Sequence, residues 1–299
     1  MNFLRPLLRF ASLNWIIPVA VLAIAAPRLA QAEALLLIEA ESGKVLEAQN
    51  ATVPWYPASV TKLMTAYVTL KAVKEGRISL DTLLTVSPVA ASQSPSKMGF
   101  RPGTQLTVDN ALKMMLVKSA NDMAVVLAEG VGGSIDGFSA QMNDAAHKLG
   151  MTQTSYVNPN GLPADGQITS ARDLAILARA IIRDLPEYEY FVHIPSIRYG
   201  RKVTQNFNKL IGRYPGADGF KTGFICAEKP SIEPPTPSAS TTAMSLADFT
   251  SIIFSALSTV TWVPARNPIL PGDCEAATWD TVSRVSSEMR PSLTALSVT

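Results

Sequence analysis

Three short polar motifs, widely separated along the chain, constrain the fold more than any other feature of this 299-residue sequence. Together they supply a serine nucleophile, two amines, a second hydroxyl and donors suited to an anion. They can act as one unit only if the fold brings the three segments to one place, where they would support acyl transfer through a serine. In chain order the motifs are Ser59-Val60-Thr61-Lys62, Ser119-Ala120-Asn121 and Lys221-Thr222-Gly223.

The first motif lies where a helix is predicted to begin. Pro57 precedes the motif, an apolar stretch follows it, and Gly76 marks the predicted end of the helix. Ser59 and Lys62 are three residues apart, so they would share one face of the first turn. The serine would also lie at the positive end of the helix dipole, which favours an oxyanion. Taken alone, Ser59 could equally be a helix cap and Lys62 a solvated surface amine.

A serine followed three residues later by lysine has little value alone, because about one such match is expected by chance in a chain of this length. Ser94–Lys97 is a second match. The Gly and Pro residues within 98–103 predict a loop there, with no helix to hold the pair together. Ser94 is therefore not a candidate nucleophile.

The other two motifs fall on elements that suit their chemistry. Residues 112–117 predict a buried helix with Met114 and Met115 as core residues, and the break at 119–121 separates it from a second helix. Residues 220–226 predict a strand after a tight turn at 218–219. Alone, the break could be structural and the strand a mere exposed edge. Their joint occurrence with the first motif favours a functional site.

Beyond the motifs, residues 33–226 resemble the serine-type D-Ala-D-Ala carboxypeptidases, the low-molecular-mass penicillin-binding proteins of the β-lactamase/transpeptidase-like superfamily. The resemblance includes Leu36–Leu46, Asn158–Leu162 and Asp218–Lys221. The order of predicted elements suggests an α/β (α+β) fold, in which a helical cluster is inserted between the first and last strands of one antiparallel sheet. The resemblance implies the same arrangement.

The resemblance also implies the catalytic roles. Ser59 would attack the carbonyl between the two terminal D-alanines of a peptidoglycan stem peptide. Lys62 would be the base, kept neutral by burial and by the cation of Lys221. Ser119 would pass a proton to the leaving nitrogen, and Asn121 would bind the substrate amide and orient Lys62.

The binding roles are implied in the same way. Lys221 and Thr222 suit the free carboxylate of the substrate, and Gly223 allows its backbone to lie close to the strand. Backbone N–H groups of Ser59 and Phe224 would form the oxyanion hole. No metal or organic cofactor is expected, and β-lactam antibiotics are expected to acylate the serine.

Two other functions fit part of this pattern. A class A β-lactamase has the same three motifs but adds a Glu-x-x-Leu-Asn motif whose glutamate activates the deacylating water. This sequence contains no such motif, so a penicillin is expected to stay attached to Ser59. The other alternative is an inactive penicillin-binding remnant, because the C-terminal region departs from the family pattern.

The sequence changes character after Ala227. Residues 228–237 contain four prolines, which argues against a central strand, and residues 228–299 are rich in Ser, Thr and Pro. We therefore expect a catalytic domain over 33–227 that lacks its last strands, then an atypical tail over 228–299 that is disordered or frameshifted. Residues 246–260 form one possible helix, which has no basic face to match a membrane anchor. Docking of this segment over the edge of strand 220–226 is the alternative to a damaged tail.

The N-terminal residues 1–32 predict a signal peptide. Arg5 and Arg9 form a basic start, residues 10–26 are mostly apolar, and Ala30–Ala32 matches a cleavage site. This indicates secretion across the inner membrane, to the periplasm or cell envelope. An uncleaved anchor and a peripheral association with the membrane are the alternatives left open.

Charge and side-chain chemistry exclude other classes of partner. The net charge is +2 at pH 7 and no concentrated basic patch is evident, so nucleic acid is not an expected partner. His147 and His193 have no second ligand at metal spacing and are expected to be structural. Cys226 and Cys274 could pair in an oxidising compartment, and Cys226 is expected to be a buried strand residue.

Overall fold

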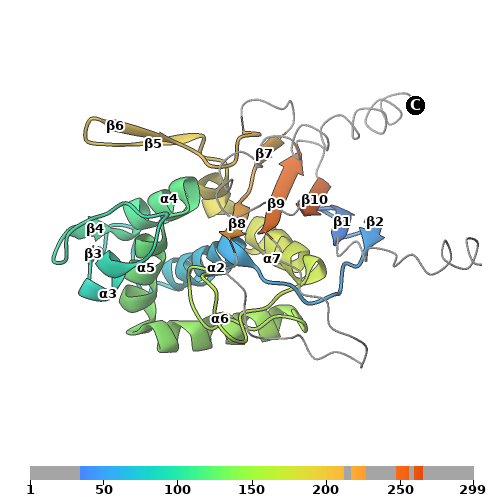
Figure 1. Cartoon of the computed structure of the whole chain (residues 1–299), viewed down its shortest axis with the longest axis horizontal. Coiled ribbons are helices and arrows are strands. Elements are labelled where there is room, and N and C mark those ends of the chain that lie inside the picture. Colours follow the sequence, from blue (N-terminus) through green and yellow to red (C-terminus); the bar gives the residue numbers. More distant parts are fainter. Residues whose placement is uncertain (1–33, 212–216, 227–246, 256–258, 265–299) are drawn as a thin grey trace, which may run out of the picture. The chain divides into compact units, whose positions relative to one another are not determined.

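A computed structural model describes residues 34–211, 217–226, 247–255 and 259–264 (Figure 1). The chain divides into two units, residues 1–32 and residues 33–299, and all described residues belong to the second unit. The predicted signal peptide and most of the predicted tail lie outside the described residues. Within the described ranges, every helix is too short or too polar to cross a lipid bilayer.

The main sheet combines strands from both ends of the described chain. Six antiparallel strands lie in the order β2-β1-β10-β9-β7, and β8 also pairs with β9. This confirms the predicted antiparallel sheet with a helical cluster inserted between its first and last strands. The strands are β1 Leu35–Glu39, β2 Val45–Gln49, β7 Ala217–Gly219, β8 Thr222–Cys226, β9 Ala247–Ser255 and β10 Thr259–Pro264.

Strands β9 and β10 overturn the expectation that the sheet lacks its last strands. Gly223 of β8 lies opposite Thr250 of β9, and Leu36 of β1 lies opposite Trp262 of β10. The possible helix over 246–260 is therefore wrong, because residues 247–255 and 259–260 lie in strands. Residues 247–255 pair along the edge of β8, as the docking alternative predicted. Two physical reasons account for the strand: the segment is rich in β-branched and aromatic residues, and two sheet edges need hydrogen-bonding partners.

The turn predicted at Asp218-Gly219 is a smaller error. These residues belong to β7, which pairs with β9 through Ala217 and Gly219, and the register shifts between these two residues. The chain therefore joins the sheet at Ala217, before the Asp-Gly pair at which a turn was predicted. The strand that follows, β8, agrees with the predicted strand over 220–226 except at its first two residues.

The helices form the second layer. Polar side chains cap several of them: the Ser170 hydroxyl, for example, accepts a hydrogen bond from the Asp173 N–H at 3.2 Å and caps the helix that begins at Ala171. The helices are the 3-10 turn η1 Ala58–Val60, α2 Thr61–Lys74, α3 Pro88–Ser92, α4 Val108–Lys118, α5 Asn121–Gly132, α6 Ile135–Leu149, α7 Ala171–Asp184 and the 3-10 segment η2 Pro186–Val192. Two small hairpins, β3 Leu83–Thr85 with β4 Gln105–Thr107 and β5 Ser196–Tyr199 with β6 Lys202–Gln205, complete the fold.

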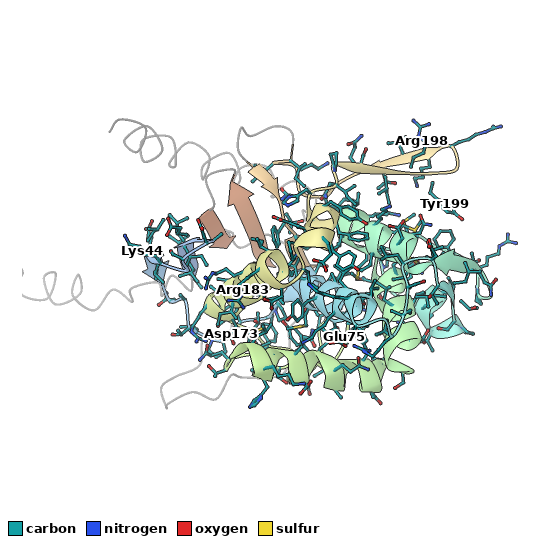
Figure 2. The ribbon with its side chains drawn as sticks, turned by 180° about the vertical axis from the view of Figure 1, so that it is seen from behind. Lys44, Glu75, Asp173, Arg183, Arg198 and Tyr199 are labelled. Carbon is teal, nitrogen blue, oxygen red and sulfur yellow. The ribbon has the colours of Figure 1, made fainter. Side chains whose placement is uncertain are left out.

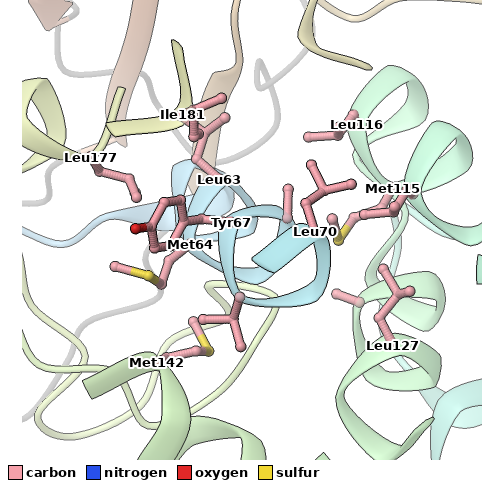
Figure 3. Packing of buried hydrophobic residues seen from close by; sticks show 14 of the residues in the cluster. Leu63, Met64, Tyr67, Leu70, Met115, Leu116, Leu127, Met142, Leu177 and Ile181 are labelled. Carbon is pink, nitrogen blue, oxygen red and sulfur yellow. The ribbon is translucent and has the colours of Figure 1, made fainter. Parts of the chain in front are cut away.

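Helix α2 occupies the centre of the hydrophobic core (Figure 3). It is buried on nearly all sides, with Leu63 and Leu70 packed among side chains of the surrounding helices. Met114 and Met115 are buried as well, which confirms their predicted role in the core. Each fully buried side chain of this size contributes about 1.5–3 kcal/mol, so the packing fixes the position of α2 and of the motif at its start.

Candidate active site

The first motif lies at the junction of η1 and α2. Lys62 Nζ donates a hydrogen bond to Ser59 Oγ at 3.0 Å, so the predicted pairing across one helical turn is present. Ala58, just before the serine, has a φ of 47°, which is strained for a residue other than glycine. Gly161 packs against it so closely that an added Cβ would lie 1.8 Å from the Ala58 carbonyl oxygen. The close contact of Gly161 with Ala58 therefore fixes the backbone before Ser59, which is partly exposed.

Lys62 is fully buried, with 0% of its surface exposed. Its amine donates a second hydrogen bond to the backbone carbonyl of Asn160 at 2.6 Å. Burial, followed by the nearby Lys221 cation, holds the pKa of Lys62 well below its ordinary value, and the Asp122 carboxylate opposes this shift. The environment favours the neutral amine that a general base requires.

The second and third motifs meet at a hydrogen bond. Ser119 separates α4 from α5 and has a left-handed backbone with a φ of 58°. Lys221 Nζ donates to Ser119 Oγ at 2.9 Å and to the Thr222 carbonyl at 2.8 Å. Burial lowers the pKa of Lys221 to about 7. Residues 102 positions apart in the sequence are thus joined directly.

Asn121 lies beside these groups but has different partners from those predicted. Its side-chain amide donates to the Ser94 carbonyl at 2.9 Å, and its backbone N–H donates to the Ser96 carbonyl at 2.7 Å. In the structure the backbone carbonyl of Asn160, rather than Asn121, orients Lys62. Ser94, excluded above as a nucleophile, lies in a loop and supports the site through its carbonyl.

Strand β8 presents the rest of the third motif. It contacts η1, the turn that contains Ser59, so Thr222 and Gly223 lie along the site. Gly223 is buried and Thr222 partly buried. The backbone of Phe224 pairs with Phe249 of β9, while the oxyanion role of its N–H stays a prediction.

Two buried residues support the site without having been predicted from the motifs. The side chain of Asn160 donates a hydrogen bond to Gln93 Oε1 at 2.8 Å. This bond links the loop whose carbonyl contacts Lys62 to the loop whose carbonyl contacts Asn121. The carboxylate of Asp122 accepts hydrogen bonds from the backbone N–H groups of Met98 and Gly99 at 2.9–3.0 Å. In the sequence, Asn160 is indicated only by the resemblance of Asn158–Leu162 to the family.

The histidines take structural positions. His193 contacts Glu189 at 3.4 Å, and His147 lies in the last turn of α6. The part of the chain that the structure describes contains no group of three or more His, Cys, Asp or Glu side chains placed to hold a metal ion. The three motifs bring hydroxyls, amines and backbone amides together at the site.

Comparison with known proteins agrees with this geometry. The family model described as peptidase S11, D-alanyl-D-alanine carboxypeptidase, matches residues 21–245. DacC of Escherichia coli is 40% identical over 200 residues, which cover 64% of this chain and 50% of DacC. DacF of Bacillus subtilis is 37% identical over 202 residues, which cover 65% of this chain and 51% of DacF.

Among solved structures, penicillin binding protein 5 from Haemophilus influenzae superposes with a TM-score of 0.65 at 30% identity, covering 77% of this chain and 64% of that one. The chain spans about half the length of the curated relatives it matches. The family match nevertheless covers most of the chain and includes all three motifs. This chain belongs to the D-alanyl-D-alanine carboxypeptidase family.

Proposed function

We propose that this chain is a serine D-alanyl-D-alanine carboxypeptidase, which removes the terminal D-alanine from peptidoglycan stem peptides through a covalent intermediate on Ser59. One observation carries the proposal: two hydrogen bonds, Lys62 to Ser59 and Lys221 to Ser119, pair a base with a nucleophile and a cation with a relay hydroxyl. Family membership supports the same chemistry.

In the acylation step, neutral Lys62 accepts the hydroxyl proton of Ser59. The serine oxygen attacks the carbonyl carbon of the D-Ala-D-Ala amide, and the C–N bond breaks. Ser119 passes the proton to the leaving nitrogen, and free D-alanine departs. Charged Lys221 and the hydroxyl of Thr222 bind the terminal carboxylate of the substrate, whose arrival raises the pKa of the Lys221 amine.

In the deacylation step, water hydrolyses the ester and restores the serine. The backbone N–H groups of Ser59 and Phe224 would stabilise the oxyanion in both steps. Gly223 carries no side chain, so the substrate backbone can lie against β8. Asn121 would contribute by contacting the substrate amide, the role that the family resemblance implies for it.

The remaining expectations belong to the same proposal. Residues 1–32 would direct the chain across the inner membrane to the periplasm or cell envelope, where peptidoglycan and β-lactam antibiotics are encountered. The catalytic domain would begin at residue 33 and extend past 227, since β9 and β10 belong to the main sheet. Peripheral association of the chain with the membrane is part of the same proposal.

Labelling with a fluorescent penicillin tests the nucleophile. The unmodified chain should form a covalent adduct that survives denaturing electrophoresis. Ser59→Ala should abolish the adduct, because no oxygen remains to form the ester, while the matched control Ser94→Ala should label normally. Persistent labelling of Ser59→Ala would refute the assignment.

Release of D-alanine from a stem pentapeptide separates the enzyme from the alternatives. A carboxypeptidase gives repeated turnover, whereas an inactive penicillin-binding remnant labels without turnover. A serine β-lactamase would instead lose the penicillin label within seconds to minutes.

A further inference from the structure

The tip of the β5–β6 hairpin carries a cluster of positive charge. Residues 190–217 contain no Asp or Glu but five Lys or Arg residues. Tyr199 pairs with Lys202 across the tip, and Arg198, Arg201 and Lys202 are all exposed. These three cations lie within five residues of the sequence, so the expectation that the chain has no concentrated basic patch is wrong at this hairpin.

A groove of about 430 Å³ runs between this hairpin and helix α4. Asn110 and Lys113 line it from α4, and Ile197 and Arg198 line it from β5. Tyr190 of η2 adds an aromatic surface. The groove therefore combines cations, an amide and apolar surface, which suits an extended chain that carries carboxylates.

The positive charge of this region is largely uncompensated. Among the described residues, no ion pair involves Arg198, Arg201 or Lys202. Lys113 is the exception, because its amine lies 2.8 Å from the Asp109 carboxylate.

Two acidic groups of η2 already have partners. Glu187 pairs with Lys74 at 3.0 Å, and Glu189 contacts His193 at 3.4 Å. The exposed cations of the hairpin are therefore available to a carboxylate from another molecule. Arginine is well suited to this, because its guanidinium binds a carboxylate through two parallel hydrogen bonds.

The hairpin is anchored to the segments that carry the active site. Beyond β6, the backbone N–H of Phe207 donates to the Val117 carbonyl at 3.0 Å, two residues before Ser119. The side chain of Asn208 donates to the Gly219 carbonyl at 2.9 Å, two residues before Lys221. The hairpin base is thus held against both motifs.

The groove also lies within reach of a substrate bound at the active site. Lys113 precedes Ser119 by six residues, which is about 9 Å along a helix axis. An extended pentapeptide spans roughly 17 Å. One stem peptide, or a peptide linked to it, can therefore occupy the catalytic serine and the groove together.

We infer that the groove between α4 and the β5–β6 hairpin binds a carboxylate-bearing peptide segment of peptidoglycan, outside the D-Ala-D-Ala end that is cleaved. The identity of this peptide rests on the proposed function, whereas the binding of an acidic peptide does not. A lipid surface is the less suitable partner, because it is flat and cannot enter a groove between two elements.

Direct binding tests the inference on the full chain. The probe is a fluorescein-labelled stem tripeptide that contains D-glutamate and lacks both terminal D-alanines, so it offers no scissile bond. Arg198→Glu should weaken binding of this probe about tenfold, as expected for reversing a charge at a carboxylate contact. The rate of penicillin labelling should stay unchanged, because Arg198 lies outside the catalytic groups.

Lys44→Glu is the matched control, because it makes the same charge reversal at another exposed cation. Lys44 lies between β1 and β2, more than 150 residues before Arg198 in the sequence (Figure 2). Its affinity for the probe should stay within twofold of the unmodified chain. Equal weakening by both variants would overturn the inference, because it would indicate attraction by overall charge alone.

Two further results distinguish a failure of this inference from a failure of the proposed function. Binding to vesicles of anionic lipid without binding of the tripeptide would also overturn the inference, in favour of a membrane-contacting surface. Loss of penicillin labelling at Ser59 with retained, Arg198-dependent tripeptide binding would refute the proposed function and leave the groove as an acidic-peptide site.

Discussion

Two buried lysines dominate the candidate site at the scale of single residues. Lys62 and Lys221 are 0% and 2% exposed, and burial lowers the pKa of each. Removing an amine from water costs stability unless it becomes neutral or well paired. The same burial that prepares Lys62 to act as a base therefore destabilises the folded chain.

The sign of the pH dependence follows from the pKa of Lys221, which is about 7 in the folded chain, whereas an ordinary exposed lysine has a pKa of 10.5. Between these two values the unfolded chain binds more protons than the folded chain. The free energy of unfolding contributed by this residue therefore rises as pH increases from about 7 to about 10.

Replacing this lysine with an apolar side chain should stabilise the chain at neutral pH while removing its activity. Lys221→Met avoids the burial of an amine but loses two hydrogen bonds, so we expect a net gain of about 2 kcal/mol at pH 7. The gain should shrink as pH rises toward 10. Urea unfolding at several pH values measures this, with exposed Lys44→Met as the control. A lower stability of Lys221→Met at pH 7 would contradict the argument.

Strand β9 is the decisive element, because it holds β8 in place. It pairs with β10 on one side and with β7 and β8 on the other, so it is a central strand. The backbone of β8 presents Thr222 and Gly223 to the site. The position of the third motif therefore depends on hydrogen bonds to a segment whose sequence bears no catalytic motif.

Interrupting β9 should damage both stability and acylation. Thr250 lies opposite Gly223 of β8 on one side and opposite Pro264 of β10 on the other. Thr250→Pro removes a backbone donor from a central strand and should cost roughly 3 kcal/mol, with loss of most penicillin labelling. Thr250→Ala keeps the donor and should cost less than about 1 kcal/mol. Urea unfolding and labelling of both variants check this, and equal behaviour of the two would show that β9 pairing is unimportant.

At the scale of the whole molecule, the main sheet joins the two ends of the described chain. β1 and β2 come from residues 35–49, and β9 and β10 come from residues 247–264. The helical layer lies between them in sequence and packs around α2. Folding of the sheet therefore requires contacts between residues more than two hundred positions apart.

Truncation tests this dependence. A chain that ends at Ala227 retains all three motifs but leaves β1 and β8 without the partners β10 and β9. Exposed edges and apolar faces should make it aggregate and lose a cooperative thermal transition. The 299-residue chain should melt cooperatively, because β1 and β8 are paired with β10 and β9. A cooperative melt of the truncated chain, with normal D-alanine release, would show that the C-terminal strands are dispensable.

The sequence determined those features that depend on neighbouring residues. The Ser59–Lys62 pair follows from helical spacing, the break at Ser119 from an interrupted apolar helix, and the helix after Ser170 from its cap. The order of the predicted elements and the family resemblance together predicted an antiparallel sheet with inserted helices. Each of these rests on interactions within a few residues or on a pattern repeated along the segment.

Only the tertiary structure decided what depends on distant partners. Residues 247–255 form a strand because β8 and β10 lie on either side of them, although a helix was also possible from the sequence. The partner of Lys62 is a carbonyl 98 residues away, and no local pattern identifies it. The cationic groove likewise requires α4 beside the hairpin. Hydrogen bonding and charge act through space, so a linear pattern predicts them only when the partners are also neighbours in the chain.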